Sequence, residues 1–247
     1  INRQWSLNVK VLVLGHNGML GNMVCDYLRE VKDVSVSTTR YRWPSDSFKL
    51  SVKNFDGEYI INCIGAIPQK TKKFKINYEL PIWLDENVNC RIIHPATDCE
   101  MDDDEYGKSK FKAGRHLSMH GSKTKQIVTS IIGHELNSSS SLLDWFLNSK
   151  DDVSGYTECY WNGNTTLEWI KQAHKMMMNW ERYAKRTVIS SICISKYELL
   201  TTIKEVYDKD IVIHKDDKVQ VNKCLSGQIK VPTIKEQLRE LRDFYGS

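Results

Sequence analysis

The chain has 247 residues, enough to bury a full α/β core as one domain or as a large domain with a small appendage. Its net charge is +4, and its 35 lysines and arginines are spread along the sequence, which argues against a dedicated nucleic-acid binder. No apolar run approaches the roughly 18 residues of a membrane span, and no signal peptide precedes Trp5. We therefore expect a cytoplasmic, enzyme-sized protein with neither a nucleic-acid nor a membrane partner.

The cysteines give a second constraint. There are seven, an odd number, and no two of them form a C-x-x-C pair. This pattern favours reduced thiols in an intracellular protein over a disulfide framework or a zinc site. We predict no metal site.

A short apolar run and three glycines form the most informative stretch. Residues 9–14 predict a strand buried on both faces, and residues 19–28 predict a helix. Between them the spacing is G-x-x-G-x-x-G. The first glycine allows a tight turn, and the later ones let the backbone approach a pyrophosphate at the helix N-terminus. The unit predicts a dinucleotide site, with a plain strand-to-helix turn as the alternative. The expected cofactor contacts here are Gly15, Asn17, Gly18, Met19, Leu20 and Gly21.

The next strand indicates which dinucleotide is bound. Residues 33–38 predict this strand, and Thr39, Arg40 and Arg42 follow it. An NAD enzyme usually has an acidic residue here, whereas a hydroxyl and arginines suit the 2′-phosphate of NADP. We therefore predict NADPH as the cofactor. A solvated pair of arginines in a loop is the alternative.

Strands and helical stretches alternate along the rest of the first half. Residues 59–64 predict a strand that ends in glycine, with Cys63, Ile64, Gly65 and Ala66 expected beside the cofactor. A helical stretch interrupted by Pro81 and a strand at 91–94 follow. This alternation predicts an α/β fold, a Rossmann-like doubly wound parallel sheet.

The candidate catalytic residues follow the strand at 91–94. Tyr106 and Lys110 are four residues apart, so on a helix they share one face. A lysine ammonium favours the phenolate form of a tyrosine and brings its proton exchange nearer neutral pH. The hydroxyl of Thr97 can hold the same substrate oxygen. Together the three side chains predict a site that protonates a carbonyl oxygen while a nicotinamide delivers hydride to its carbon. A surface pair on a helix is the alternative for Y-x-x-x-K alone.

The second half of the chain supplies further elements. We expect a strand at 128–133, helices at 142–147 and 165–178, a short strand from Ile189, a helix at 196–207, a strand near Ile211 and a helix at 233–245. We predict an NADP-binding domain formed by residues 1–130 and about 153–188. A smaller, discontinuous α/β substrate-binding portion would comprise about 131–152 and 189–247.

These motifs together resemble the dTDP-4-dehydrorhamnose reductases, which are extended short-chain dehydrogenases/reductases. The matching segments are Gly15-x-x-Gly18-x-x-Gly21, Asn62-Cys-Ile-Gly-Ala, Asn77-x-x-x-Pro81, Thr97-Asp98, Tyr106-Gly-Lys-Ser-Lys110, Thr129–Glu135, Tyr160–Leu167 and Ile194–Leu200. The resemblance implies that NADPH reduces the 4-keto group of a UDP- or dTDP-linked 4-keto-6-deoxyhexose. It assigns the catalytic roles to Thr97, Tyr106 and Lys110, of which the last two also contact the cofactor. The expected substrate contacts are Thr97, Asp98, His134, Asn137 and Trp145.

The chain departs from this family in two places. Residues 98–105 are the only ones between Thr97 and Tyr106, where the family has a longer loop. Val128 stands where relatives commonly have arginine.

Cys99 and His134 raise the question of a second reaction. In GDP-fucose synthases, a related branch, a cysteine and a histidine at or near these positions act as base and acid in epimerising the carbons beside the keto group. A thiol and an imidazole can both exchange protons near neutral pH. A bifunctional 3-epimerase/4-reductase of the L-rhamnose or N-acetyl-L-rhamnosamine type therefore stays open beside a simple reductase.

Two other functions are compatible with the same motifs. The methionine adenosyltransferase β subunit resembles this family and binds NADP as a non-catalytic regulatory subunit. A reductase of a small carbonyl compound is the other option. The oligomeric state also stays open, with a homodimer as one option.

Overall fold

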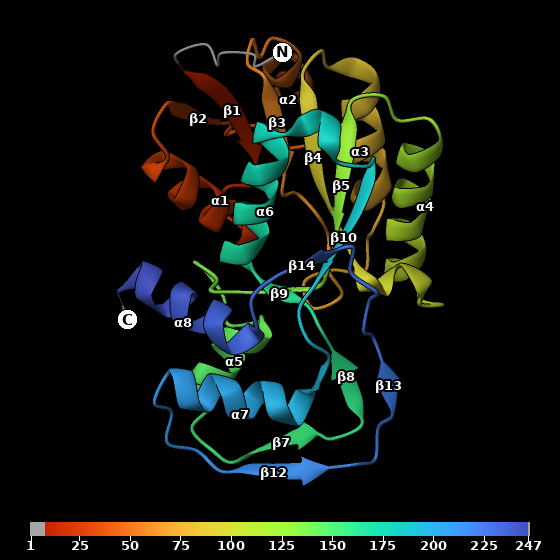
Figure 1. The fold of residues 1–247 in the computed structure, drawn as a ribbon. Helices are drawn as coiled ribbons and strands as arrows, with labels where there is room; N and C mark the ends of the chain where they lie inside the picture. Colours follow the sequence, from red (N-terminus) through yellow and green to blue (C-terminus); the bar gives the residue numbers. More distant parts are fainter. Residues whose placement is uncertain (1–7, 247) are drawn as a thin grey trace.

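The computed structural model describes residues 8–246, so the segment around Trp5 lies outside the described residues. A seven-stranded sheet forms its centre, in the order β14-β10-β5-β4-β3-β1-β2, and every neighbouring pair is parallel (Figure 1). The order reverses at β1 and β3, which makes the carboxyl ends of these strands the expected place for a ligand. The doubly wound α/β prediction is confirmed. The strands are β1 Val9–Leu14, β2 Val34–Thr38, β3 Tyr59–Asn62, β4 Arg91–Ala96, β5 Thr124–Val128, β10 Arg186–Ser190 and β14 Ile229–Lys230.

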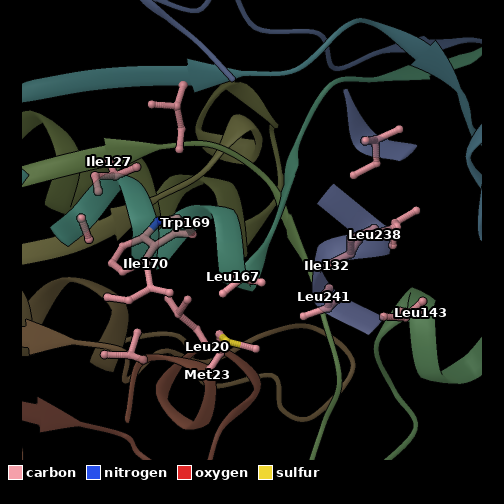
Figure 2. Packing of buried hydrophobic residues seen from close by; sticks show 14 of the residues in the cluster. Leu20, Met23, Ile127, Ile132, Leu143, Leu167, Trp169, Ile170, Leu238 and Leu241 are labelled. Atoms are coloured by element: carbon pink, nitrogen blue, oxygen red, sulfur yellow. The ribbon is translucent and has the colours of Figure 1, made fainter. Parts of the chain in front are cut away.

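Helices cover both faces of this sheet because alternate strand residues point to opposite sides. Val9, Val11 and Val13 of β1 belong to one apolar cluster with α1 (Met19–Glu30) and α6 (Thr166–Met178). Leu12 and Leu14 belong to the other cluster, with α2 (Asp46–Lys53) and α3 (Ile76–Asn87). The helix α4 (Glu105–Met119) lies beside α3 (Figure 1). Figure 2 shows Leu20 and Met23 of α1 close to Leu167 and Ile170 of α6.

A smaller layer lies beyond the carboxyl ends of the main strands (Figure 1). Its helices are α5 (Leu142–Asn148), α7 (Lys196–Val206) and α8 (Ile234–Tyr245). Leu238 and Leu241 of α8 lie near Ile132 and Leu143 in its core (Figure 2). The short strands pair as β11 (Ile194–Ser195), β8 (Cys159–Trp161) and β13 (Val221–Asn222), as β12 (Ile213–Asp216) with β7 (Val153–Tyr156), and as β6 (Ile131–Ile132) with β9 (Asn164–Thr165).

One predicted strand was misplaced. The strand of the main sheet is β5, Thr124–Val128, and only the short β6 forms within the predicted 128–133. The sequence hides β5 because its first three residues are polar although all are buried. All three form hydrogen bonds within the protein. The Thr124 hydroxyl donates to Asp85, the Lys125 ammonium donates to the carbonyl oxygens of Trp180 and Tyr183, and the Gln126 amide donates to the Gly114 carbonyl at 3.3 Å. Polar residues that are satisfied in this way cannot be distinguished from loop residues by hydropathy.

The division into two portions stays a prediction. Strand β14 comes from the range assigned to the substrate-binding portion, yet it pairs with β10 at the edge of the main sheet. Among residues 8–246, no helix is long and apolar enough to cross a bilayer.

The prediction of reduced thiols throughout is wrong for two cysteines. Cys193 and Cys224 form a disulfide across 31 residues of sequence. Both flank strand β8, because Cys193 precedes β11 and Cys224 follows β13, and these strands pair with opposite edges of β8. Where β8 ends, Asn162 accepts from the Leu225 N–H at 2.8 Å, which draws the second segment inward. Such a pairing depends on the sheet and not on any spacing visible in the sequence.

Candidate functional site

The glycine turn after β1 has the form of a phosphate cradle. Gly15 has φ +81°, and a Cβ there would lie 3.0 Å from backbone atoms of Cys63 and Ile64. A Cβ on Gly21 would collide with the carbonyl oxygen of Gly15, so α1 packs directly on the turn. Gly18 donates its N–H to the same carbonyl at 3.0 Å and begins α1 without a side-chain cap. The first N–H groups of α1 can therefore serve an anion.

The other residues predicted for the pyrophosphate contact differ in exposure. Asn17 and Gly18 are exposed, Met19 is half-buried and Leu20 is buried in the core. Leu20 thus contributes packing and its backbone.

The predicted 2′-phosphate residues lie just past β2, next to the end of β1, since Val13 pairs with Thr38. The Thr39 hydroxyl accepts from the Tyr41 N–H at 3.3 Å. The exposed guanidinium of Arg40 lies 5.3 Å from the centre of the Tyr41 ring, and Arg42 is also exposed. These cations are accessible to a bound anion.

The segment after β3 lies beside the glycine turn, at the carboxyl ends of β1 and β3. Asn77 of α3 clamps Ala66, accepting its N–H at 2.7 Å and donating to its carbonyl at 3.0 Å. Gly65 is exposed, and a Cβ there would lie 3.6 Å from the Lys110 Nζ. Lys110 therefore reaches from α4 to the backbone predicted to contact the cofactor.

Thr97 and Tyr106 meet beside the end of β4. The Thr97 hydroxyl donates to Asp98 at 2.9 Å, accepts from the Cys99 N–H at 3.3 Å, and shares a hydrogen bond with the Tyr106 phenol. The Cys99 thiol also donates to Asp98, at 3.5 Å. Four of the five predicted catalytic residues, Thr97, Cys99, Tyr106 and Lys110, therefore come from this small region.

Eight residues connect Thr97 to Tyr106. The first four of them form a single 3₁₀ turn, η1 (Asp98–Met101). Asp104 then caps α4 by accepting the Gly107 N–H at 2.6 Å. A Cβ on Gly107 would collide with carbonyl oxygens of Cys99 and Asp102, so the glycine lets α4 start this close to η1. The short connection therefore places the predicted catalytic side chains of Thr97 and Tyr106 close together.

Burial decides the protonation of the two central groups. It raises the pKa of the Tyr106 phenol above its ordinary value, and the Thr97 hydrogen bond only partly opposes this. Burial lowers the pKa of the Lys110 ammonium to about 8. Tyr106 is therefore a neutral phenol at neutral pH, ready to donate a proton. The expected lowering of the Tyr106 pKa by Lys110 is not found, because burial is the largest influence and the lowering contribution comes from Thr97.

His134 lies in a different set of contacts from Cys99. Its Nδ1 is 2.7 Å from the Asp144 carboxylate, its Nε2 is 3.1 Å from the Tyr207 hydroxyl, and its ring meets the Tyr245 ring edge to face. Both ring nitrogens are thus occupied, one by Asp144 of α5 and the other by Tyr207, which directly follows α7. The described contacts do not bring His134 together with Cys99.

The remaining predicted substrate residues are at the surface. Asn137 is exposed, and the Trp145 side chain on α5 is 45% exposed. They are open to a ligand, and their assignment stays a prediction. Among residues 8–246, no group of three or more His, Cys, Asp or Glu could hold a metal.

The sequence reading missed two lysines that approach the catalytic turn from the small layer. Lys223 pairs with Asp102 just after η1. Lys196 is the first residue of α7, and its Nζ lies 4.9 Å from the Trp161 ring centre. The negative charge of Asp98 acts to raise the pKa of the Lys196 ammonium. A cation in the first turn of a helix opposes the helix dipole, and that local mismatch was a usable signal.

Comparison with solved structures adds the fold of known relatives. No protein-family model matches the sequence, and no curated protein matches it either. A dTDP-4-dehydrorhamnose reductase of Bacillus anthracis, in complex with NADP, superposes with a TM-score of 0.73 at 13% identity, covering 95% of this chain and 98% of that one. The fold is that of these reductases.

Two further solved structures have the same fold. A dTDP-4-dehydrorhamnose reductase of Clostridium acetobutylicum gives a TM-score of 0.70 at 18% identity, covering 97% of this chain and 100% of that one. A GDP-L-fucose synthetase of Naegleria fowleri bound to NADP gives 0.72 at 14% identity, covering 98% and 94%. The shared fold spans almost the full length of each chain, so the short turn between Thr97 and Tyr106 is a local variation within it.

Proposed function

We propose that the protein is an NADPH-dependent reductase of the 4-keto group of a nucleotide-linked 4-keto-6-deoxyhexose. The observation that carries the proposal is the contact of the half-buried Thr97 with Tyr106 at the end of β4, on the helix whose Lys110 reaches Gly65. Two solved structures of similar fold contain bound NADP, and the names of both proteins describe the reduction of a nucleotide-linked sugar. The glycine cradle and the exposed Arg40 and Arg42 are suited to the same cofactor.

The side chains divide the work of carbonyl reduction. When bound, the nicotinamide supplies the hydride that reaches the carbonyl carbon. The Tyr106 phenol donates its proton to the carbonyl oxygen, and burial keeps that proton available at neutral pH. The Thr97 hydroxyl is placed to hold the same oxygen. Lys110, with its ammonium at Gly65, would contact the bound cofactor on the strand β3 side.

The small layer is suited to the nucleotide-sugar. It faces the catalytic turn through Lys196 and Lys223, and it presents Trp145 and Asn137 at its surface. A small carbonyl compound would not need this much additional surface. This favours a large substrate of the UDP- or dTDP-linked class.

The proposal does not include C3 epimerisation. Cys99 borders the catalytic cluster, but burial raises the pKa of its thiol to about 11, which disfavours a thiolate base. His134, the expected acid, is held by Asp144 and Tyr207. An incubation of wild type with a 4-keto sugar in D₂O, without NADPH, tests this. We expect no deuterium beside the carbonyl above the buffer background, and incorporation that Cys99→Ser slows would restore the epimerase hypothesis.

The decisive test of the reductase is a substrate panel. Purified protein and NADPH are incubated with nucleotide 4-keto-6-deoxy sugars of different base and C2 substituent, and the products are identified by NMR. Consumption of NADPH with a new C4 hydroxyl is the expected result. Tight NADPH binding with no reduction of any member would instead favour a regulatory subunit, the second candidate.

A further inference from the structure

Glu100 is a buried carboxylate that the proposed chemistry does not use. It lies in η1, and its side chain is 8% exposed. Arg186 of β10 holds it through two parallel bonds, Nη2 to Oε2 at 2.6 Å and Nη1 to Oε1 at 3.4 Å. Arg186 also donates to the Gln126 side chain at 3.2 Å. Burial raises the pKa of the Glu100 carboxyl, and the charge and hydrogen bonds of Arg186 are the largest influences that oppose this and favour its ionised form.

The carboxylate lies on the face of α4 that carries Lys110. Gly114 is one turn beyond Lys110 on that helix, so the two share a face. A Cβ on Gly114 would lie 2.8 Å from the Arg186 Nη1 and 2.9 to 3.0 Å from both Glu100 oxygens. The glycine therefore makes the space in which the ion pair sits against the helix. Glu100 and Lys110 are both buried there.

The other groups that act on Lys110 come from neighbouring elements. Cys99 of η1 also raises the pKa of Lys110, and His94 of β4 lies close enough for Lys110 to help lower the pKa of its imidazole. Arg186 acts on His94 in the same direction from β10. Burial lowers the pKa of Lys110, and Glu100 is the largest influence that opposes it. The structure thus holds an alternating series of charges, Arg186, Glu100 and Lys110.

We infer that Glu100, fixed by Arg186, is a positioning residue whose charge keeps Lys110 protonated at its place beside Gly65. The consequence for catalysis rests on the proposed function, but the charge relation itself does not. A charged Lys110 is what the site needs to contact the cofactor as a cation. Losing the Glu100 charge would let Lys110 give up its proton at a lower pH.

The test follows Lys110 directly and needs neither substrate nor cofactor. Protein labelled with ¹³C at lysine Cε is titrated by NMR, and the Lys110→Arg variant assigns the signal. We expect Glu100→Gln to shift the Lys110 titration midpoint to lower pH. The matched control is Glu105→Gln, which removes an exposed carboxylate from the first turn of the same helix and should leave the midpoint unchanged. An unchanged midpoint in folded Glu100→Gln overturns the inference.

A second variant covers the case in which Glu100→Gln unfolds because Arg186 loses its partner. The double variant Glu100→Gln/Arg186→Met removes both charges together, and its Lys110 midpoint should also fall. Glu100→Asp keeps the charge and should stay near wild type. In the reductase assay, Glu100→Gln should lose rate at a lower pH on the alkaline side. Absence of reduction in wild type would refute the proposed function, whereas the NMR midpoint would still decide the role of Glu100.

Discussion

Tyr106 is the side chain that we propose as the proton donor. Its phenol is held by Thr97 and flanked by the Phe74 ring, 5.8 Å between centroids. We expect Tyr106→Phe to lower the reduction rate by about 10²–10⁴-fold, the usual cost of losing a general acid. NADPH affinity should change little, because the phosphate cradle is formed by Gly15, Gly18 and Gly21. Stopped-flow rates and a fluorescence titration with NADPH measure the two effects, and near wild-type turnover would place the acid elsewhere.

We predict that a preference for NADPH depends on two exposed arginines. Arg40 and Arg42 follow β2 with no acidic residue between Thr38 and Arg42. We expect Arg40→Ala/Arg42→Ala to weaken NADPH binding, with little effect on NADH. Because both guanidinium groups are exposed, solvent and salt weaken such charge-assisted bonds. Lys32→Ala is a matched control in the turn before β2. Isothermal titration of both cofactors gives the ratio, and an unchanged ratio would contradict this assignment.

Among the elements, the start of β5 is anchored by one carboxylate. Asp85 of α3 accepts from the N–H groups of Ser122 and Lys123 at 3.0 Å each and from the Thr124 hydroxyl at 2.7 Å. Burial of Asp85 opposes ionisation, but these hydrogen bonds outweigh it and lower the pKa of the carboxyl. The contribution to stability is therefore complete above the unfolded pKa of about 3.9 and is lost as pH falls through the folded value.

We accordingly expect Asp85→Ala to lower the free energy of unfolding at pH 7 by about 2 kcal/mol, since three donors lose their acceptor. The difference from wild type should shrink below about pH 4, where the wild-type carboxyl also becomes protonated. Urea unfolding at several pH values measures this. Asp56→Ala removes an exposed carboxylate from a surface ion pair and should cost far less. A deficit in Asp85→Ala that is independent of pH would mean that packing, not charge, was lost.

Hydropathy and glycine spacing were enough to predict the large helices and most main strands. The helices at 19–30, 166–178 and 234–245 have clear apolar faces, so their predicted bounds are close to the observed ones. β5 was missed because its buried polar residues depend on partners such as Trp180 and Gly114 that are distant in sequence. The short strands carry too few residues for a period to show. Glu100 was missed for the same reason, since its partner Arg186 is 86 residues away.

At the scale of the whole molecule, the disulfide ties the small layer together. Cys193–Cys224 closes a loop of 31 residues, and such a crosslink contributes typically 2–4 kcal/mol. We expect dithiothreitol to lower the free energy of unfolding by an amount in this range. The variant Cys193→Ala/Cys224→Ala should already have that lower stability and should not respond to the reductant. Equal stability of wild type with and without dithiothreitol would show that the crosslink contributes nothing.

The first and last helices of the described chain touch. The Asn22 amide on α1 donates to the Tyr245 hydroxyl at the end of α8, across 223 positions. During synthesis on the ribosome α1 emerges before α8, so this contact cannot form until α8 has been translated. Because α1 begins at the glycine turn, full cofactor affinity should arise late, at the stage when α8 leaves the exit tunnel. Stalled nascent chains that end before and after α8 would report that step through their retention on a cofactor resin.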